Sequence, residues 1–195
     1  MAQGLRLGFV DKWGLCIVCY TILVTNFLES MTKNKSESKA KVIIQPKPSK
    51  FRLVAKRSSA GLGLYTLDFI KKGEQIIQYG GYKITNEEAD RVGGKYLFEI
   101  LKSKFTINGT PRWNLARYAN HACKPNAEAV WYGQEVFICS RKNIQPGEEI
   151  TYNYGRVYFT DIIGGEKKCR CAVHHPQKGH LGKLTEAEMK KYAKR

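Results

Sequence analysis

Alternation of apolar and polar residues predicts a series of short β-strands that begins at residue 51. Residues 51–55 (Phe-Arg-Leu-Val-Ala) alternate as a half-buried strand does. Strand-like patterns recur at residues 96–101, 104–107, 128–132 and 135–140, and Gly133 with Gln134 offers a hairpin turn between the last two. The pattern therefore predicts a mainly β fold built from small sheets.

A repeated heptapeptide supports this prediction. Residues 70–76 and 144–150 share Ile-x-x-Gly-Glu-x-Ile, in which a tight turn at the glycine leads into a strand. Helical patterns are confined to residues 86–92 and to the last segment of the chain. There Thr185-Glu186-Ala187-Glu188 is typical of a capping box, and Leu184 with Met189 would form its hydrophobic staple.

The segments outside this pattern differ in composition. Residues 1–30 are apolar, and their uncharged run at 13–28 is shorter than the roughly 20 residues of a membrane-spanning helix. We interpret them first as an extension upstream of a start at Met31, with a membrane anchor and a secretion signal as alternatives. The polar, Lys- and Ser-rich composition of residues 31–50 predicts a flexible basic linker. The remaining predicted parts are a folded domain at 51–160, a tail at 161–182 and a terminal helix at 183–195.

Charge adds a second constraint. The chain has 195 residues, of which 43% are hydrophobic, which suits one globular domain with appendages. Its 33 Lys and Arg against 17 Asp and Glu give a formal net charge of +16, which predicts attraction to polyanions. Because much of the excess lies in the flanks, at residues 33–50 and 183–195, sequence-specific recognition of nucleic acid is not expected.

Candidate chemistry is concentrated in residues 117–126, Arg-Tyr-Ala-Asn-His-Ala-Cys-Lys-Pro-Asn. Pro125 fixes its own φ and restrains Lys124 to extended geometry, so this segment predicts a sharp turn that presents its polar groups in a set direction. Such a density of amide, imidazole and thiol groups indicates a functional site. An Asn/Pro-rich surface turn beside a core cysteine is the alternative.

Two further segments flank this turn at fixed places along the chain. Residues 59–66 read Ser-Ala-Gly-Leu-Gly-Leu-Tyr-Thr, and residues 145–155 read Gln-Pro-Gly-Glu-Glu-Ile-Thr-Tyr-Asn-Tyr-Gly. In this order, and with Tyr79-Gly80-Gly81 between them, the segments resemble those of the SET-domain protein lysine methyltransferases over residues 51–171. The resemblance implies the SET-type fold, with few short helices and a C-terminal pseudoknot in which the chain around Asn120 is threaded through a loop.

The resemblance also implies residue roles. Tyr154 takes the place of the catalytic tyrosine, and Tyr79 and Tyr152 take the places of lysine-channel residues. Around the cofactor, S-adenosylmethionine, it places Gly61, Leu62, Gly63, Tyr96, Arg117, Asn120, His121 and Tyr154. Aromatic walls suit this chemistry because they exclude water and present π surfaces to a sulfonium or a methylated amine. The alternative for each tyrosine taken singly is a core aromatic, and for Gly61-Leu62-Gly63 a simple turn.

Three positions depart from the family pattern. Asn108 and Asn153 stand where aspartate is common, and Leu62 replaces a frequent aromatic residue. None of these changes removes Tyr154 or the Asn-His pair, so we expect activity to be retained. The departures bear on the affinity for the cofactor.

The six cysteines suggest buried thiols or a metal more than disulfides. Cys139 lies on a predicted strand and is expected in the core. Cys169-Arg170-Cys171 resembles the start of a post-SET zinc motif, which would join Cys123 around one ion. The later cysteine of that motif is absent here, and His174, His175 or His180 would replace it in a Cys3His site, for which we take His175. Without zinc, this tail would pack over the cofactor cleft.

These features predict an S-adenosylmethionine-dependent protein-lysine N-methyltransferase that favours monomethylation, since Tyr152 carries a hydroxyl group. The expected partner is a protein with an exposed lysine, a histone or another basic protein, in the cytoplasm or at chromatin. No stable membrane span is expected, and the sequence indicates no oligomeric state. A catalytically silent SET-like lysine-binding module and a basic chromatin-binding protein remain as alternatives.

Overall fold

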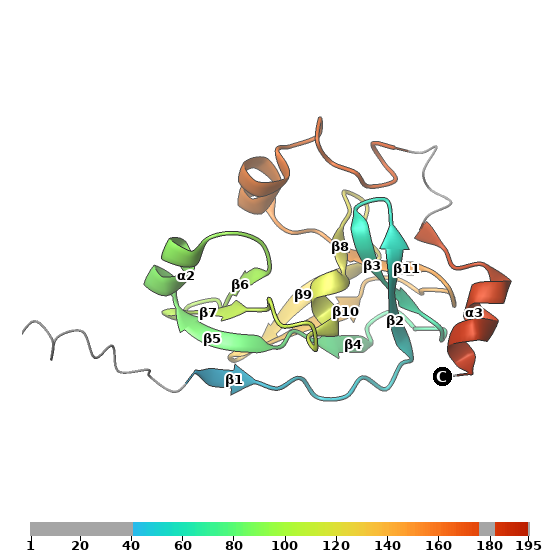
Figure 1. Ribbon diagram of the computed structural model, residues 1–195, viewed down its shortest axis with the longest axis horizontal. Helices are drawn as coiled ribbons and strands as arrows, with labels where there is room; N and C mark the ends of the chain where they lie inside the picture. Colours follow the sequence, from blue (N-terminus) through green and yellow to red (C-terminus); the bar gives the residue numbers. More distant parts are fainter. Residues whose placement is uncertain (1–40, 176–181, 195) are drawn as a thin grey trace, which may run out of the picture. The chain divides into compact units, whose positions relative to one another are not determined.

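Short strands dominate the part of the chain that the computed structural model describes, residues 41–175 and 182–194. They form three small sheets, whose strands are labelled in Figure 1. The first sheet has the order β1 (Val42–Ile44), β5 (Gly81–Thr85), β7 (Phe105–Asn108) and β6 (Leu97–Glu99), and all of its pairs are antiparallel. The predicted mainly β fold is thus confirmed.

The second sheet has the order β4 (Gln75–Gln78), β10 (Glu135–Ser140) and β9 (Ala127–Tyr132). Strands β9 and β10 form the predicted hairpin, in which Glu135 pairs with Tyr132 across the turn. Val136 and Ile138 on β10 are fully buried. This sheet therefore supplies much of the hydrophobic core.

The third sheet brings the sequence motifs together. Its order is β2 (Leu53–Ser58), β3 (Gly61–Thr66), β11 (Glu149–Tyr152) and β8 (Asn120–His121). Strand β11 pairs with β3 through its first half and with β8 through its second, where Thr151 lies opposite Asn120 and Tyr152 opposite His121. The β8–β11 pair is parallel, and it joins segments that are about thirty residues apart in the manner that a pseudoknot requires.

The repeated heptapeptide forms a pair of related turns. Ile70 and Ile144 exchange backbone hydrogen bonds of 2.9 and 2.8 Å. Gly73 and Gly147 adopt φ angles of +87° and +83°, which L side chains rarely adopt. Each turn leads into a strand, β4 or β11, as predicted, and the four isoleucines at its ends are fully buried.

Both predicted helices are present. Helix α2 (Asn86–Val92) begins after Thr85, and α3 (Glu186–Ala193) begins after Thr185 with the complete capping box. Leu184 and Met189 pack in one cluster with Tyr65, which holds α3 beside β2, as Figure 1 shows. No helix in the described ranges is long and apolar enough to cross a membrane.

Three features differ from the predictions. A 3₁₀ turn, η1 (Leu115–Tyr118), and a π-helical turn, η2 (Tyr158–Ile163), were not predicted, because such short elements leave no periodic pattern. Predicted strand 96–101 shortens to β6, since Tyr96 and Lys102 have φ angles of 70° and 56°.

The predicted linker at residues 31–50 is wrong from residue 41 onward. Val42–Ile44 forms β1, because this apolar run pairs with the free edge of β5. The segment that follows is also held to the domain, since the backbone N–H of Lys47 donates to Oε1 of Gln78 and the Ser49 hydroxyl donates to the Ile76 carbonyl. The predictions for residues 1–40 lie outside the described residues.

Candidate active site

A cleft of about 1720 Å³ lies where the motif segments meet. Its walls come from the turn before β3, the segment around β6, the η1–β8 segment, and residues 152–163 with the tail that follows. The predicted catalytic and cofactor residues that line it are Gly61, Leu62, Tyr79, Tyr96, Arg117, Asn120, His121, Tyr152 and Tyr154. The structure thus gathers this set, with Gly63 as the exception.

Aromatic rings form the inner part of the cleft. The rings of Tyr152 and Tyr154 lie 4.7 Å apart, and Phe98 stacks on Tyr152 at 6.2 Å. Tyr79 contacts Phe98 at 4.9 Å, and Tyr158 meets Tyr154 edge-on at 5.1 Å. The arrangement is a box of π surfaces, suited to an uncharged or methylated amine and to a sulfonium.

Two of the phenol groups are held by backbone carbonyls. The Tyr154 hydroxyl donates to the Ala119 carbonyl at 2.8 Å, and the Tyr79 hydroxyl donates to the Tyr96 carbonyl at 3.1 Å. Burial raises the pKa of Tyr79, Tyr152 and Tyr154 well above the ordinary value of 10. All three phenols are therefore neutral at physiological pH.

Tyr158 and Trp131 complete the aromatic lining, and sequence analysis missed both. Trp131 lies on β9, contacts Phe98 with the rings tilted and their centroids 5.7 Å apart, and donates its indole N–H to the Glu99 carbonyl. Tyr158 begins η2, four residues after Tyr154. That helical spacing within an aromatic-rich segment was the one signal that could have identified Tyr158.

Arg117 also lines the cleft. Its guanidinium lies 4.0 Å above the ring of Tyr96, and one terminal nitrogen donates to the Thr110 carbonyl. Its Nε is buried and has no hydrogen-bond partner among the described residues. An unpartnered N–H of a cationic group in a cleft can accommodate an anionic group of a ligand.

Asn120 is fixed by a buried carboxylate that sequence analysis did not single out. The Asn120 amide Nδ2 lies 2.7 Å from Oε1 of Glu149 and 3.0 Å from both the Leu62 carbonyl and the Ser58 hydroxyl. Desolvation by burial raises the pKa of Glu149. Asn120 and Glu149 together thus connect β8 and β11 to the end of β2 and the start of β3.

Gly63 serves this carboxylate and does not line the cleft. A Cβ on Gly63 would collide with the side chain of Glu149. Of the three residues expected to approach a cofactor, only Gly61 and Leu62 line the cleft. Gly61 has a φ of +115°, which a side chain would strain.

His121 uses both ring nitrogens within the chain. Its Nδ1 accepts from the backbone N–H of Tyr154 at 3.2 Å, and its Nε2 lies 3.4 Å from the Cys123 sulfur. Burial lowers the pKa of His121, so the neutral form is favoured. The imidazole connects the segment that carries Tyr154 to the turn that carries Cys123.

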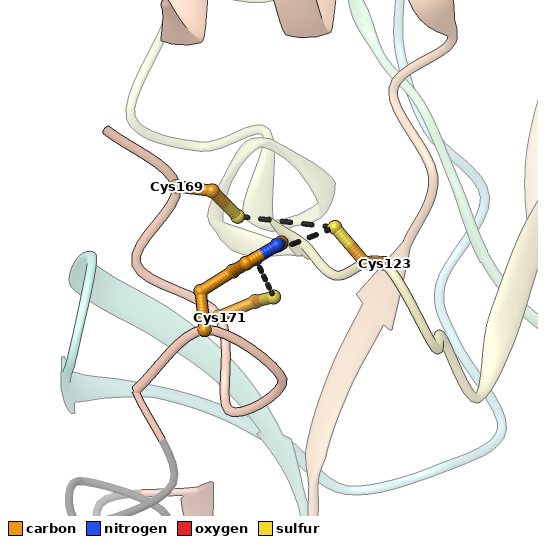
Figure 2. A group of neighbouring side chains, drawn as sticks. Cys123, Cys169 and Cys171 are labelled. Carbon is orange, nitrogen blue, oxygen red and sulfur yellow. Dashed lines mark hydrogen bonds between the residues drawn. The ribbon is translucent and has the colours of Figure 1, made fainter. Parts of the chain in front are cut away.

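Cys123, Cys169 and Cys171 point toward one another (Figure 2), and His174 joins them. The four ligand atoms lie within 4.8 Å of one another. The Cys123 sulfur is 4.0 Å from that of Cys169 and 3.8 Å from Nδ1 of His174, which is 3.5 Å from the Cys171 sulfur. Three thiols and one imidazole form a donor set that zinc accepts.

His175, which the sequence analysis takes as the fourth ligand, is not part of this cluster, whereas His174 is. The backbone N–H of His175 donates to the Cys171 carbonyl, and its side chain lies outside the cluster. The turn after Cys171 directs the preceding residue, His174, toward the sulfurs instead. His180 lies outside the described residues. Cys139 is buried on β10, apart from the cluster, as predicted.

The fold is that of a SET domain, and comparison with known proteins agrees. Residues 61–155 match the sequence model of the SET domain. The chain contains this domain over those residues. The crystal structure of KRYPTONITE in complex with mCHH DNA, H3(1-15) peptide and SAH resembles this fold with a TM-score of 0.50 and 28% identity, over 58% of this chain and 25% of that one.

The curated relatives that this chain resembles include proteins named histone-lysine N-methyltransferases. "Histone-lysine N-methyltransferase set-2" of Caenorhabditis elegans is 36% identical over 56% of this chain and 8% of its own length. "Histone-lysine N-methyltransferase ASHR3" of Arabidopsis thaliana is 32% identical over 70% of this chain and 29% of its own. The chain thus spans less than a third of the length of these relatives.

The buried carboxylate predicts a pH dependence of stability. Because the pKa of Glu149 is raised in the folded state, its contribution is full below the ordinary value of 4.5 and is lost as the pH rises through the raised pKa. Glu149→Gln removes this titration and keeps an oxygen that accepts from Asn120. We expect the unfolding free energy of the unmodified protein to fall, relative to that of the variant, above pH 4.5.

Urea unfolding at a series of pH values measures this difference. Glu166→Gln, at an exposed carboxylate, is the control and should run parallel to the unmodified protein. Parallel curves for Glu149→Gln as well would show that Glu149 ionises as freely in the folded protein as in the unfolded chain.

Proposed function

We propose that this chain is an S-adenosylmethionine-dependent protein-lysine N-methyltransferase. The observation that carries the proposal is the aromatic box around Tyr154 within a SET domain. The names of the relatives and the SAH in the KRYPTONITE complex support it.

The cleft fits the cofactor in chemical terms. S-adenosylmethionine, when bound, supplies a methyl group activated by a sulfonium. The buried, unpartnered Nε of Arg117 suits a carboxylate, and the rings of Tyr154 and Tyr158 suit an adjacent cation. Both ring nitrogens of His121 are already used, so its ring faces and backbone, rather than its nitrogens, would contribute to binding.

The box must also prepare the substrate amine. A free lysine has a pKa of about 10.4 and is charged at neutral pH, whereas only the neutral amine is a nucleophile. Burial between aromatic rings disfavours the ammonium form. Because Tyr79, Tyr152 and Tyr154 stay neutral, no phenolate opposes this deprotonation.

Tyr154 is positioned from two sides. Its hydroxyl is held by the Ala119 carbonyl, and its backbone is held by His121. This fixes the phenol oxygen at the place where a lysine nitrogen would approach. Precise placement of reacting groups can supply several kcal/mol of a barrier.

The cysteine cluster is proposed to hold one zinc ion. Tetrahedral zinc, with bonds of about 2.3 Å to sulfur and about 2.0 Å to nitrogen, separates its ligand atoms by about 3.5 to 3.8 Å. The separations of His174 Nδ1 from two of the sulfurs, 3.5 and 3.8 Å, match this range. The ion would be structural, because it would fasten the tail that walls the cleft to the turn that carries Cys123.

Tyr154→Phe tests the proposed function. The change removes a hydroxyl from the box and keeps the ring, so we expect methylation of lysine to be abolished and S-adenosylmethionine binding to be nearly unchanged. Labelled-methyl transfer and calorimetry measure the two properties. Tyr132→Phe, at an exposed tyrosine outside the cleft, is the control.

Asn120→Ala, unlike Tyr154→Phe, should weaken the binding of S-adenosylmethionine itself. It removes the group that fixes the Leu62 carbonyl and Glu149, so cofactor binding should weaken by about 1 to 3 kcal/mol.

Full methylation by Tyr154→Phe would contradict the role given to that tyrosine.

Tyr152 is proposed to limit the number of methyl groups transferred. Its hydroxyl has no hydrogen-bond partner among the described residues, so it is available to an amine or a water. Tyr152→Phe should therefore turn a monomethylating enzyme into one that forms di- or trimethyl-lysine, with the second step about tenfold faster. Mass spectrometry of a peptide substrate after exhaustive reaction measures the number of methyl groups on the lysine. Trimethyl-lysine from the unmodified enzyme would rule this role out.

The zinc site provides a matched pair of variants. Purified protein should contain about one zinc per chain, and Cys169→Ser and His174→Ala should lose it. His175→Ala, one residue along, should retain it. Elemental analysis measures the metal directly. Retention in His174→Ala with loss in His175→Ala would restore the assignment made from the sequence.

A further inference from the structure

Many basic side chains line the cleft. Besides Arg117, six cations line it, namely Lys95, Arg112, Arg156, Lys167, Lys168 and Arg170, and each is exposed. Only two carboxylates, Glu99 and Asp161, line the cleft in the described part of the chain. The walls of the cleft therefore carry a strong excess of positive charge.

This charge is not neutralised within the described residues. Their ion pairs all lie elsewhere, and the cations that form them are Lys47, Lys50, Arg52, Lys56, Arg141 and Lys183. A cleft with walls of one sign focuses its field and raises the local concentration of oppositely charged groups. The six cations are thus available to a ligand.

The proposed cofactor does not account for them. S-adenosylmethionine has one carboxylate, for which Arg117 is already available, and it has an ammonium and a sulfonium that the other cations would repel. The lysine that enters the aromatic box is itself a cation before it loses its proton. The compensating negative charge must therefore come from the rest of the substrate.

We propose that the preferred substrate is a protein segment in which acidic side chains flank the target lysine. This inference rests on the proposed methyltransferase function, and it replaces the basic protein expected from the sequence with an acidic segment. A segment rich in Lys and Arg would bring like charges together, which suppresses binding. Aspartate and glutamate side chains on either side of the lysine would instead pair with the cations around the box.

Nucleic acid is the competing anionic ligand, and the geometry favours a peptide. The cations come from three separate segments, at residue 95, residue 112 and residues 156–170, and they surround a cleft with an aromatic box inside it. A duplex would instead require cations spread over a face that can follow its phosphates. The common entrance points to a chain whose one lysine reaches inward.

Three peptides with a single central target lysine test the proposal, with the flanking positions occupied by glutamate, glutamine or arginine. Fluorescence polarisation measures their binding without turnover, and labelled-methyl transfer measures kcat/KM. We expect the glutamate peptide to bind about tenfold more tightly than the glutamine peptide. Its kcat/KM should also be about tenfold higher, chiefly because its KM is lower, and both differences should shrink as the salt concentration rises. The arginine peptide should be the weakest.

Reversal of charge in the chain should reverse the preference. Lys167→Glu with Lys168→Glu should weaken the glutamate peptide and improve the arginine peptide. Lys190→Glu with Lys191→Glu, on α3 and away from the cleft, applies the same change in net charge and should leave the preference intact.

The outcomes separate the two proposals. Preferred binding of the glutamate peptide without methyl transfer to any peptide would support the charge inference and count against the methyltransferase. Methylation of all three peptides with equal or arginine-favouring kcat/KM would overturn the charge inference alone. Displacement of the bound glutamate peptide by duplex DNA at lower concentration than by free glutamate peptide would also overturn it, in favour of nucleic acid.

Discussion

The parallel pairing of β8 with β11 is the constraint on which the site depends. Asn126 secures it from the end of the intervening turn, since its Nδ2 donates to the Glu149 carbonyl at 2.8 Å and its Oδ1 accepts from the Thr151 N–H at 2.9 Å. Asn126 is buried, so both bonds are made away from water and are costly to lose. Asn120 holds the other end through Glu149. Two asparagines thus fix the strand that carries Tyr152.

The same pairing couples two centres that differ in chemistry. Nδ1 of His121 accepts a hydrogen bond from the backbone N–H of Tyr154, and Nε2 lies against the sulfur of Cys123 in the cysteine cluster. Phe159, on η2, packs against the same ring at 5.0 Å. The tail that the cluster fastens therefore bears directly on the aromatic box, and order in one centre supports order in the other.

Local patterns in the sequence were sufficient for most of the strands and for both helices, but not for β1. The hairpin of β9 and β10 follows from alternation and a two-residue turn, and the capping box at Thr185 follows from four residues. What escaped prediction depends on tertiary contact. Glu149 gains its role only because Gly63 leaves room for it, and the choice of His174 over His175 is set by a turn that no short pattern specifies.

The distribution of charge shows the same limit. From the sequence, the net charge of +16 is associated with the lysine-rich flanks, where the basic residues are adjacent. The six cations of the cleft form no such run, because the fold assembles them from segments separated by up to 75 residues between Lys95 and Arg170. Their proximity is a property of the fold. The same sign of charge that the composition assigns to the flanks therefore also lines the cleft with the aromatic box, and there it favours an anionic ligand.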